Sequence, residues 1–301
     1  NDKTGVVMDA ANANGIVITG GTNDNGTYTI SDTASALSDT NFTKGANSKA
    51  ATSVTAVIAN NNEDITGVTF DSDVTNINLN DKTGVVMDAA NANGIVISGG
   101  TNNNGTYSIT DTSSALSDGN FTKGNGSKTA ASVTVLVAGN AEDIAAIDLD
   151  SDVTAINLND KTGVILDMAN IGTRTISTGT NSQGTYVVRD AATNLTTAGG
   201  GFDLTANGNP DAASVTAVVA ANSEDLSAVT LDSDVTNIDL NDKTGVVMDA
   251  GNANGRVISG GTNDNGTYTI SDTASALSDA NFTKGNGSKA AISVTAVIAT
   301  N

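Results

Sequence analysis

The side chains best suited to chemistry in this chain are aspartates that return at fixed intervals. Nine of them follow two patterns, Asp-Ser-Asp and Asn-Asp, at Asp71, Asp73, Asp81, Asp150, Asp152, Asp160, Asp232, Asp234 and Asp242. Carboxylates, together with Asn side chains and backbone oxygens, are hard ligands that suit Ca²⁺. If short segments stack in register, these turns lie close together, and the nine aspartates predict calcium binding. The alternative is that Asp and Asn fill turns, where their side chains replace backbone hydrogen bonds.

Composition excludes several classes of function. The chain has no Cys and no His, and its 33 acidic and 13 basic residues give a net charge of −20. Thiol chemistry, a Ser-His-Asp triad and the usual zinc sites are therefore absent. The acidity argues against binding nucleic acid, and no apolar run is long enough to insert into a membrane. Paired carboxylates such as Asp73 or Glu63 permit hydrolysis in principle, but they recur in near-identical copies. We therefore expect no enzyme.

The chain is built from a repeat of 79 residues. The pentapeptide Asp-Lys-Thr-Gly-Val begins at Asp2, Asp81, Asp160 and Asp242, which stand 79, 79 and 82 residues apart. The units are 2–80, 81–159, 160–241 and 242–301, and the last is incomplete. The third unit carries a three-residue insertion in the segment that holds Gly199, Gly200, Gly201 and Pro210, where we expect a surface loop. We expect a single elongated repeat array over residues 1–301.

Short β-branched clusters, separated by Gly, Asn and Asp, predict strands. In the first unit they are Val6–Met8, Ile16–Ile18, Tyr28–Ile30, Val54–Ile58, Val68–Phe70 and Val74–Leu79. The pattern predicts an all-β fold, a parallel β-solenoid with three triangular coils in each unit. The alternative is a tandem array of immunoglobulin-like β-sandwiches, which the missing Trp disfavours. Asp32–Leu37, with Asp32 as N-cap, and Asn62–Ile65 each predict one helical turn.

One motif of the repeat has a counterpart elsewhere. The run Tyr28-Thr29-Ile30-Ser31-Asp32-Thr33-Ala34, ending at Leu37, resembles a repeat of very large secreted bacterial surface proteins, such as RTX-type adhesins and surface-layer (S-layer) proteins. The resemblance implies a structural protein at the bacterial cell surface or in the extracellular space. The glycine-rich calcium nonapeptide of RTX proteins is absent, so their calcium mechanism does not carry over.

These observations predict a non-enzymatic structural protein. A solenoid that stops within a unit exposes unpaired strand edges, and we expect copies to stack head-to-tail into a filament or surface layer stabilised by cations such as Ca²⁺. The expected partner is the chain itself, with cell-surface glycans as a second candidate. The alternative is the calcium-stiffened stalk of a bacterial adhesin, which extends a distal domain for cell adhesion.

Overall fold

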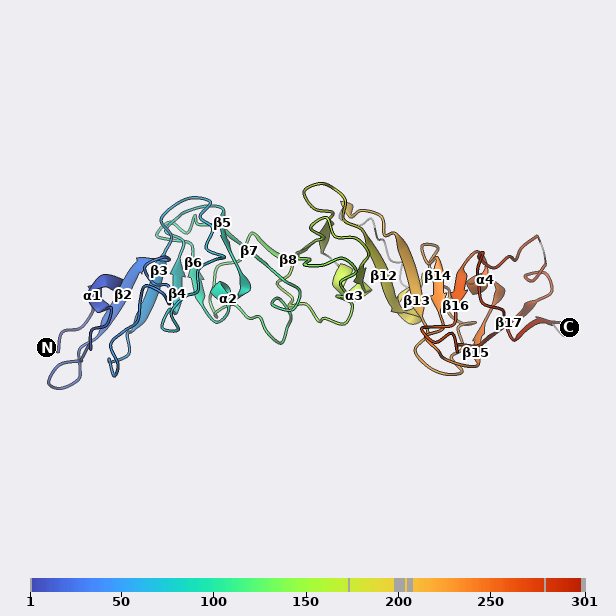
Figure 1. The fold of residues 1–301 in the computed structure, drawn as a ribbon, viewed down its shortest axis with the longest axis horizontal. Helices are drawn as coiled ribbons and strands as arrows, with labels where there is room; N and C mark the ends of the chain where they lie inside the picture. Colours follow the sequence, from blue (N-terminus) through green and yellow to red (C-terminus); the bar gives the residue numbers. More distant parts are fainter. Residues whose placement is uncertain (1, 173, 198–203, 205–207, 279, 299–301) are drawn as a thin grey trace. The chain divides into compact units, whose positions relative to one another are not determined.

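The computed structural model describes all residues except 1, 173, 198–203, 205–207, 279 and 299–301. The chain forms two compact units, residues 1–136 with 149–155 and residues 137–148 with 156–301. Figure 1 shows that each unit consists of short strands stacked side by side. Strand pairing is parallel in both, so the chain is an all-β, parallel β-solenoid. The alternative of immunoglobulin-like sandwiches is wrong, because those folds pair their strands antiparallel.

Two sheets form the walls of the solenoid in the first unit. One wall holds β1 (Val6–Met8), β2 (Tyr28–Thr33), β3 (Ser53–Val57), β4 (Asn76–Asn78) and β6 (Val96–Ser98). The other wall holds β5 (Val85–Met87), β7 (Tyr107–Asp111) and β8 (Ser132–Leu136). From β4 to β7 the chain changes wall at each strand.

The second unit repeats this arrangement. One wall holds β10 (Val164–Leu166), β12 (Tyr186–Ala191), β13 (Ser214–Val218), β14 (Asn237–Asp239) and β16 (Val257–Ser259). Opposite this wall, β9 (Ala155–Asn157), which starts at the unit boundary, lies next to β11 (Thr175–Ser177). A separate three-stranded sheet holds β15 (Val246–Met248), β17 (Tyr268–Thr273) and β18 (Ser293–Val297).

Each coil contains two strand positions rather than three. Val6 pairs with Tyr28, 22 residues later, and Asn76 pairs with Val96, 20 residues later. The expectation of triangular coils with about 26 residues is therefore wrong. Segments outside the named strands complete the walls, since Gly45 donates to the Ile16 carbonyl at 3.1 Å and Asp64 bridges to Val86.

One repeat contains an odd number of chain segments that lie in the walls, so equivalent residues of successive repeats lie in opposite walls. Val6 lies in the wall of β1, whereas its counterpart one repeat later, Val85, lies in the opposite wall. The same holds in the second unit for Val164 and Val246. Within each unit, one repeat therefore spans a whole number of coils plus half a coil, and equivalent side chains alternate between the two walls.

The core lies between the walls. Inward residues alternate along the strands, so that Ile30, Val54 and Ile77 are buried while their neighbours are partly exposed. The tyrosines of all four repeats are also buried, and the Tyr107 hydroxyl donates to the Lys128 carbonyl at 2.5 Å. Burial raises the pKa of Tyr107 to about 12.

One four-residue helix follows the first strand of each repeat. The helices are α1 (Ala10–Ala13), α2 (Ala89–Ala92), α3 (Met168–Ile171) and α4 (Ala250–Ala253), with a 3₁₀ turn η1 (Ala192–Asn194) in the third repeat. The helical turn predicted at Asp32–Leu37 is present as a single hydrogen-bonded turn, in which the Leu37 amide donates to the Thr33 carbonyl at 3.2 Å. Asp32 is not its N-cap, since this residue lies within β2 and its oxygens accept from the Ala10 and Thr33 amides. No helix among the described residues is long and apolar enough to cross a membrane.

Candidate functional site

The Asp-Ser-Asp tripeptides form tight turns in which a side-chain carboxylate accepts a hydrogen bond from a backbone amide of the same turn. The carboxylate of the first Asp accepts from the amide of the second in all three copies: Asp71 from Asp73 at 2.9 Å, Asp150 from Asp152 at 2.7 Å and Asp232 from Asp234 at 3.0 Å. Burial raises the pKa of Asp71 and of Asp150. These first carboxylates therefore act in turn formation, as the alternative interpretation of the sequence holds.

The second Asp of the tripeptide is an ion-pair partner in the first unit. Lys44 Nζ lies 3.0 Å from Asp73, and Lys123 Nζ lies 3.1 Å from Asp152. Both lysine side chains are largely buried, so each pair holds two segments of the solenoid together.

The Asp of the pentapeptide joins two successive coils. Asp81 accepts hydrogen bonds from the Asn102 amide at 3.1 Å, the Asn104 amide at 2.9 Å and the Asn102 side chain at 3.1 Å. Asp2, Asp160 and Asp242 make the same bonds in their repeats. The backbone donors hold the pKa of Asp81 below its ordinary value.

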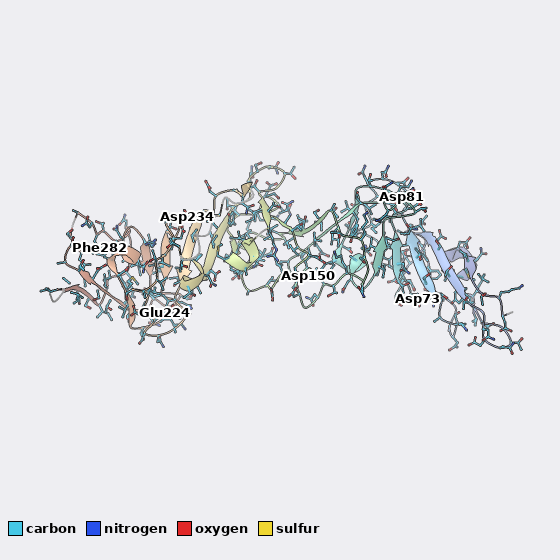
Figure 2. The ribbon with its side chains drawn as sticks, turned by 180° about the vertical axis from the view of Figure 1, so that it is seen from behind. Asp73, Asp81, Asp150, Glu224, Asp234 and Phe282 are labelled. Carbon is cyan, nitrogen blue, oxygen red and sulfur yellow. The ribbon has the colours of Figure 1, made fainter. Side chains whose placement is uncertain are left out.

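The two aspartate patterns do not meet. Asp73 and Asp81 lie beyond opposite ends of β4, and Figure 2 shows them at opposite edges of the first unit. The expectation that their turns lie close together is therefore wrong, since a coil has two strand positions. Among the described residues, no three acidic side chains are gathered in a group that could hold a metal ion. Calcium binding by the nine aspartates stays a prediction.

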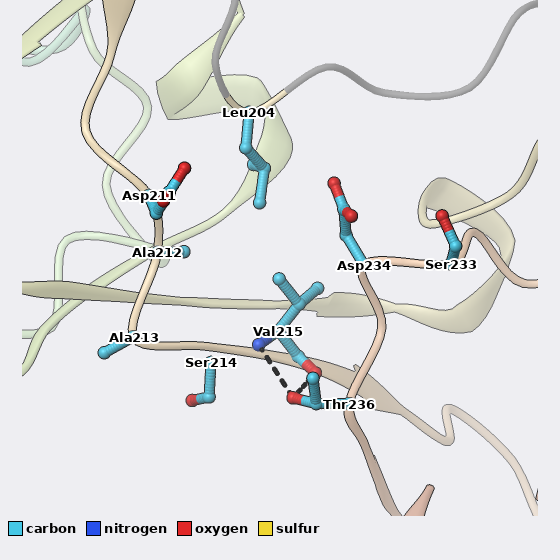
Figure 3. A pocket seen from close by; sticks show the side chains of 9 residues that line it. All are labelled: Leu204, Asp211, Ala212, Ala213, Ser214, Val215, Ser233, Asp234 and Thr236. Carbon is cyan, nitrogen blue, oxygen red and sulfur yellow. Dashed lines mark hydrogen bonds between the residues drawn. The ribbon is translucent and has the colours of Figure 1, made fainter. Parts of the chain in front are cut away.

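The third repeat contains a pocket of about 320 Å³. Figure 3 shows Asp211 and Asp234 on either side of Leu204, above Val215 and Thr236. Thr236 Oγ1 accepts from the Val215 amide at 3.3 Å and closes the floor. The insertion at Gly199–Gly201 lies outside the described residues. Of the two carboxylates that line the pocket, Asp211 belongs to the segment where the sequence predicts a loop, and Asp234 belongs to the Asp-Ser-Asp tripeptide.

A second cavity, of about 300 Å³, lies in the first unit between Val68 and Ile95. Sequence analysis did not identify it. The signal that could have revealed it is a substitution within the repeat, because the position of Ile95 is held by Arg174 and Arg256 in the next two repeats. A change from an aliphatic residue to arginine at a buried position marks a polar environment in that wall.

The open ends of the solenoid expose apolar side chains that are buried elsewhere in the repeat. Val294 in β18 is 52% exposed, whereas its counterpart Val54 in β3 is 2% exposed. At the other end Val6 is 41% exposed, and its counterpart Val85 is 0% exposed.

Comparison with known proteins gives no relative for this chain. No protein-family model matches the sequence, and no match was found among curated proteins or among solved structures.

Proposed function

We propose that this chain is a non-enzymatic structural repeat protein of an extracellular or cell-surface assembly, and that its copies stack head-to-tail. The observation that supports the proposal is that successive repeats stack edge to edge, since Asn76 of the first repeat pairs in parallel with Val96 of the second. Within this stack Ile58, the repeat counterpart of Ile298, is 0% exposed. Fully burying one such side chain contributes about 1.5–3 kcal/mol, so several together favour association.

The polar groups of the end strand support the same contact. The Val54 carbonyl in β3 accepts from the Thr75 amide at 3.0 Å, and the Ile58 amide, one residue after β3, donates to the Asn78 carbonyl at 3.0 Å. Their repeat counterparts are Val294 in β18 and Ile298, one residue after β18. A second copy that places its first coil against β18 would supply both apolar cover and backbone partners. Because the two surfaces differ, the contact is heterologous and growth continues without closure.

The composition fits a surface role. A charge of −20 keeps single copies apart at low ionic strength, and dissolved cations screen this repulsion. Cation-dependent assembly is therefore part of the proposal. The surface location rests on the resemblance of the tyrosine motif to repeats of secreted bacterial proteins.

Sedimentation velocity and negative-stain electron microscopy of the purified chain over a range of concentrations test the proposal. We expect filaments or sheets that grow with concentration and with Ca²⁺, and that EGTA reduces. Replacing Val294 and Ile298 by Lys should abolish them, because the charges cannot be buried at the contact. Thr295→Lys is the matched control, since the Thr55 position of the repeat points away from the core.

Single particles at all concentrations, with or without Ca²⁺, would contradict self-assembly and favour an adhesin stalk. Assembly that persists equally in the Val294 and Ile298 variant would place the contact elsewhere on the molecule.

A further inference from the structure

In the second unit an arginine side chain occupies a seat made of carbonyl oxygens. Arg256 is 9% exposed, and its Nη1 donates to the carbonyls of Gly251 at 2.9 Å and Asn252 at 3.1 Å. Its Nη2 donates to the Asp232 carbonyl at 2.8 Å, and its Nε to the Val235 carbonyl at 2.9 Å. The geometry matches the planar fork of a guanidinium, which presents several donors in fixed directions.

The carboxylates beside this seat favour a cation. Burial lowers the pKa of Arg256, and the neighbouring Asp249 and Asp232 act against that shift. Asp249 is also the N-cap of α4, so its position is fixed by the helix. A guanidinium in this position thus has both its hydrogen bonds and its charge compensated.

The preceding repeat contains the same interaction in part. Arg174 Nη1 donates to the carbonyls of Ala169 at 2.8 Å and Asn170 at 3.2 Å. These residues are the counterparts of Gly251 and Asn252. The carbonyls at the end of this short helix therefore accept a guanidinium in two repeats.

In the first unit the corresponding position holds Ile95, and the corresponding space is the cavity of about 300 Å³. The residues that line it include the counterparts of the seat: Phe70, Asp71, Val74, Asp88, Ala90 and Asn91. Val74, Asn91 and Ile95 are buried and form its floor, whereas Ser72, Ala90 and Asn93 are exposed at its rim. A ligand can therefore enter from solvent.

The charges of the cavity match those of the occupied seat. Asp71 and Asp88 correspond to Asp232 and Asp249, and no basic residue lines the cavity. Burial raises the pKa of both Asp71 and Asp88, so a cation placed beside them would relieve an unfavourable environment. Phe70, which replaces Leu231 of the occupied seat, adds an aromatic ring to the lining.

We propose that the cavity between Val68 and Ile95 is a binding site for a guanidinium group, supplied by a small molecule or by an arginine side chain of another polypeptide. The Arg256 seat is the internal template for the site. Its hydrogen bonds assign the Asp71, Val74, Ala90 and Asn91 carbonyls as acceptors and the Asp71 and Asp88 carboxylates as counter-charges.

Isothermal titration calorimetry of the full chain with methylguanidinium tests the proposal. We expect saturable binding with one site per chain, at least about tenfold tighter than binding of n-butylammonium, which has the charge but not the planar fork. Ile95→Arg should abolish it by filling the site from within. Arg256→Ala should raise the stoichiometry to two, because it empties the second seat.

Asp88→Asn provides a variant that keeps the fold, since Asn is an equally good N-cap for α2. It should weaken binding about tenfold or more while far-UV circular dichroism stays unchanged. The peptide acetyl-Gly-Arg-Gly-amide distinguishes the two sources. Binding tighter than that of methylguanidinium indicates an arginine of a polypeptide, and weaker binding indicates a small molecule.

Three results would overturn the proposal. They are the absence of saturable binding to the wild-type chain, binding that Ile95→Arg leaves unchanged, and equal affinity for n-butylammonium.

Discussion

At the scale of single residues, carboxylates connect the coils of this solenoid. Asp81 accepts three hydrogen bonds from the turn at Asn102 and Asn104, one coil later. Because the same Asp begins each repeat, the contact recurs along the chain. A side chain that the sequence suggested as a metal ligand thus has a structural role that needs no metal.

Replacing this carboxylate should loosen one turn rather than unfold the chain. We expect Asp81→Ala to speed hydrogen exchange at the amides of Asn102 and Asn104, which lose their acceptor, and to leave distant strands unaffected. Hydrogen-exchange mass spectrometry measures this. Asp118→Ala, at an exposed aspartate, is the control, and equal acceleration in both variants would contradict the assigned role.

Acid should act on two groups of aspartates in opposite directions. Backbone hydrogen bonds lower the pKa of Asp81, Asp160 and Asp242, so their contribution to stability is present above the unfolded-state pKa and is lost as the pH falls through the folded-state pKa. Burial raises the pKa of Asp88 and Asp249, so their ionisation destabilises the fold as the pH rises through their folded-state pKa.

Urea unfolding midpoints between about pH 2.5 and 6 separate these two groups. The triple variant Asp81→Asn, Asp160→Asn, Asp242→Asn should lose less stability on acidification than the wild type. Asp88→Asn should lose stability on acidification more steeply than the wild type, because it removes a group whose protonation in acid favours folding. A triple variant with the wild-type acid profile would contradict the sign assigned to the first group.

At the scale of elements, several clusters of β-branched residues form strands where the sequence predicts them. Val6–Met8, Tyr28–Ile30 and Val54–Ile58 coincide with β1, β2 and β3. Val68–Phe70 does not form a strand, and only Phe70 makes an isolated bridge. β propensity alone could not decide this, since the outcome depends on which neighbour the segment meets.

The sequence analysis did not predict the four short helices, because their formation also depends on neighbouring residues. A single turn of Ala-Ala-Asn-Ala has no apolar periodicity, and its stability comes from its cap and its neighbours. Asp9, Asp88, Asp167 and Asp249 all cap these helices through the amide three residues later. The spacing Asp-x-x-Asn is visible in the sequence, but on its own it does not distinguish a capped helical turn from an ordinary Asp-containing turn.

The cap should be measurable at α3. Asp167 accepts from the Asn170 amide at 2.7 Å, so Asp167→Ala should cost about 1 kcal/mol relative to Asp167→Asn, which keeps the acceptor. The difference in the free energy of unfolding from urea titrations gives this value. Equal stability of the two variants would mean that the neighbouring strands alone hold the turn.

At the scale of the whole chain, neither the number of coils nor the place of the guanidinium site could be predicted from the sequence. The 79-residue period divides almost evenly by three, which suggested triangular coils, whereas the structure divides it into an odd number of wall segments. The same error placed the Asp71 and Asp81 turns together. The guanidinium seat also could not be predicted from the sequence, because Arg256 and its carbonyl acceptors are brought together only by the stacking of coils.

A solenoid of this kind should tolerate the loss of a whole repeat. Deleting residues 82–160 joins Asp81 to Lys161 and recreates the Asp-Lys-Thr-Gly-Val pentapeptide, so every later strand meets the neighbours that its repeat position requires. We expect a folded chain with parallel β structure by circular dichroism. Its urea m-value should be lower by about a quarter, in proportion to the length removed.

Deleting residues 82–120 is the matched control, since it joins Asp81 to Phe121 and removes only part of a repeat. The inward pattern of β5 and β7 is then lost, and Phe121 enters a turn where the repeat places Lys82. This shorter deletion should be more destabilising than the longer one, although it removes half as many residues. If stability instead followed only the number of residues removed, register between the repeats would not be what holds the chain together.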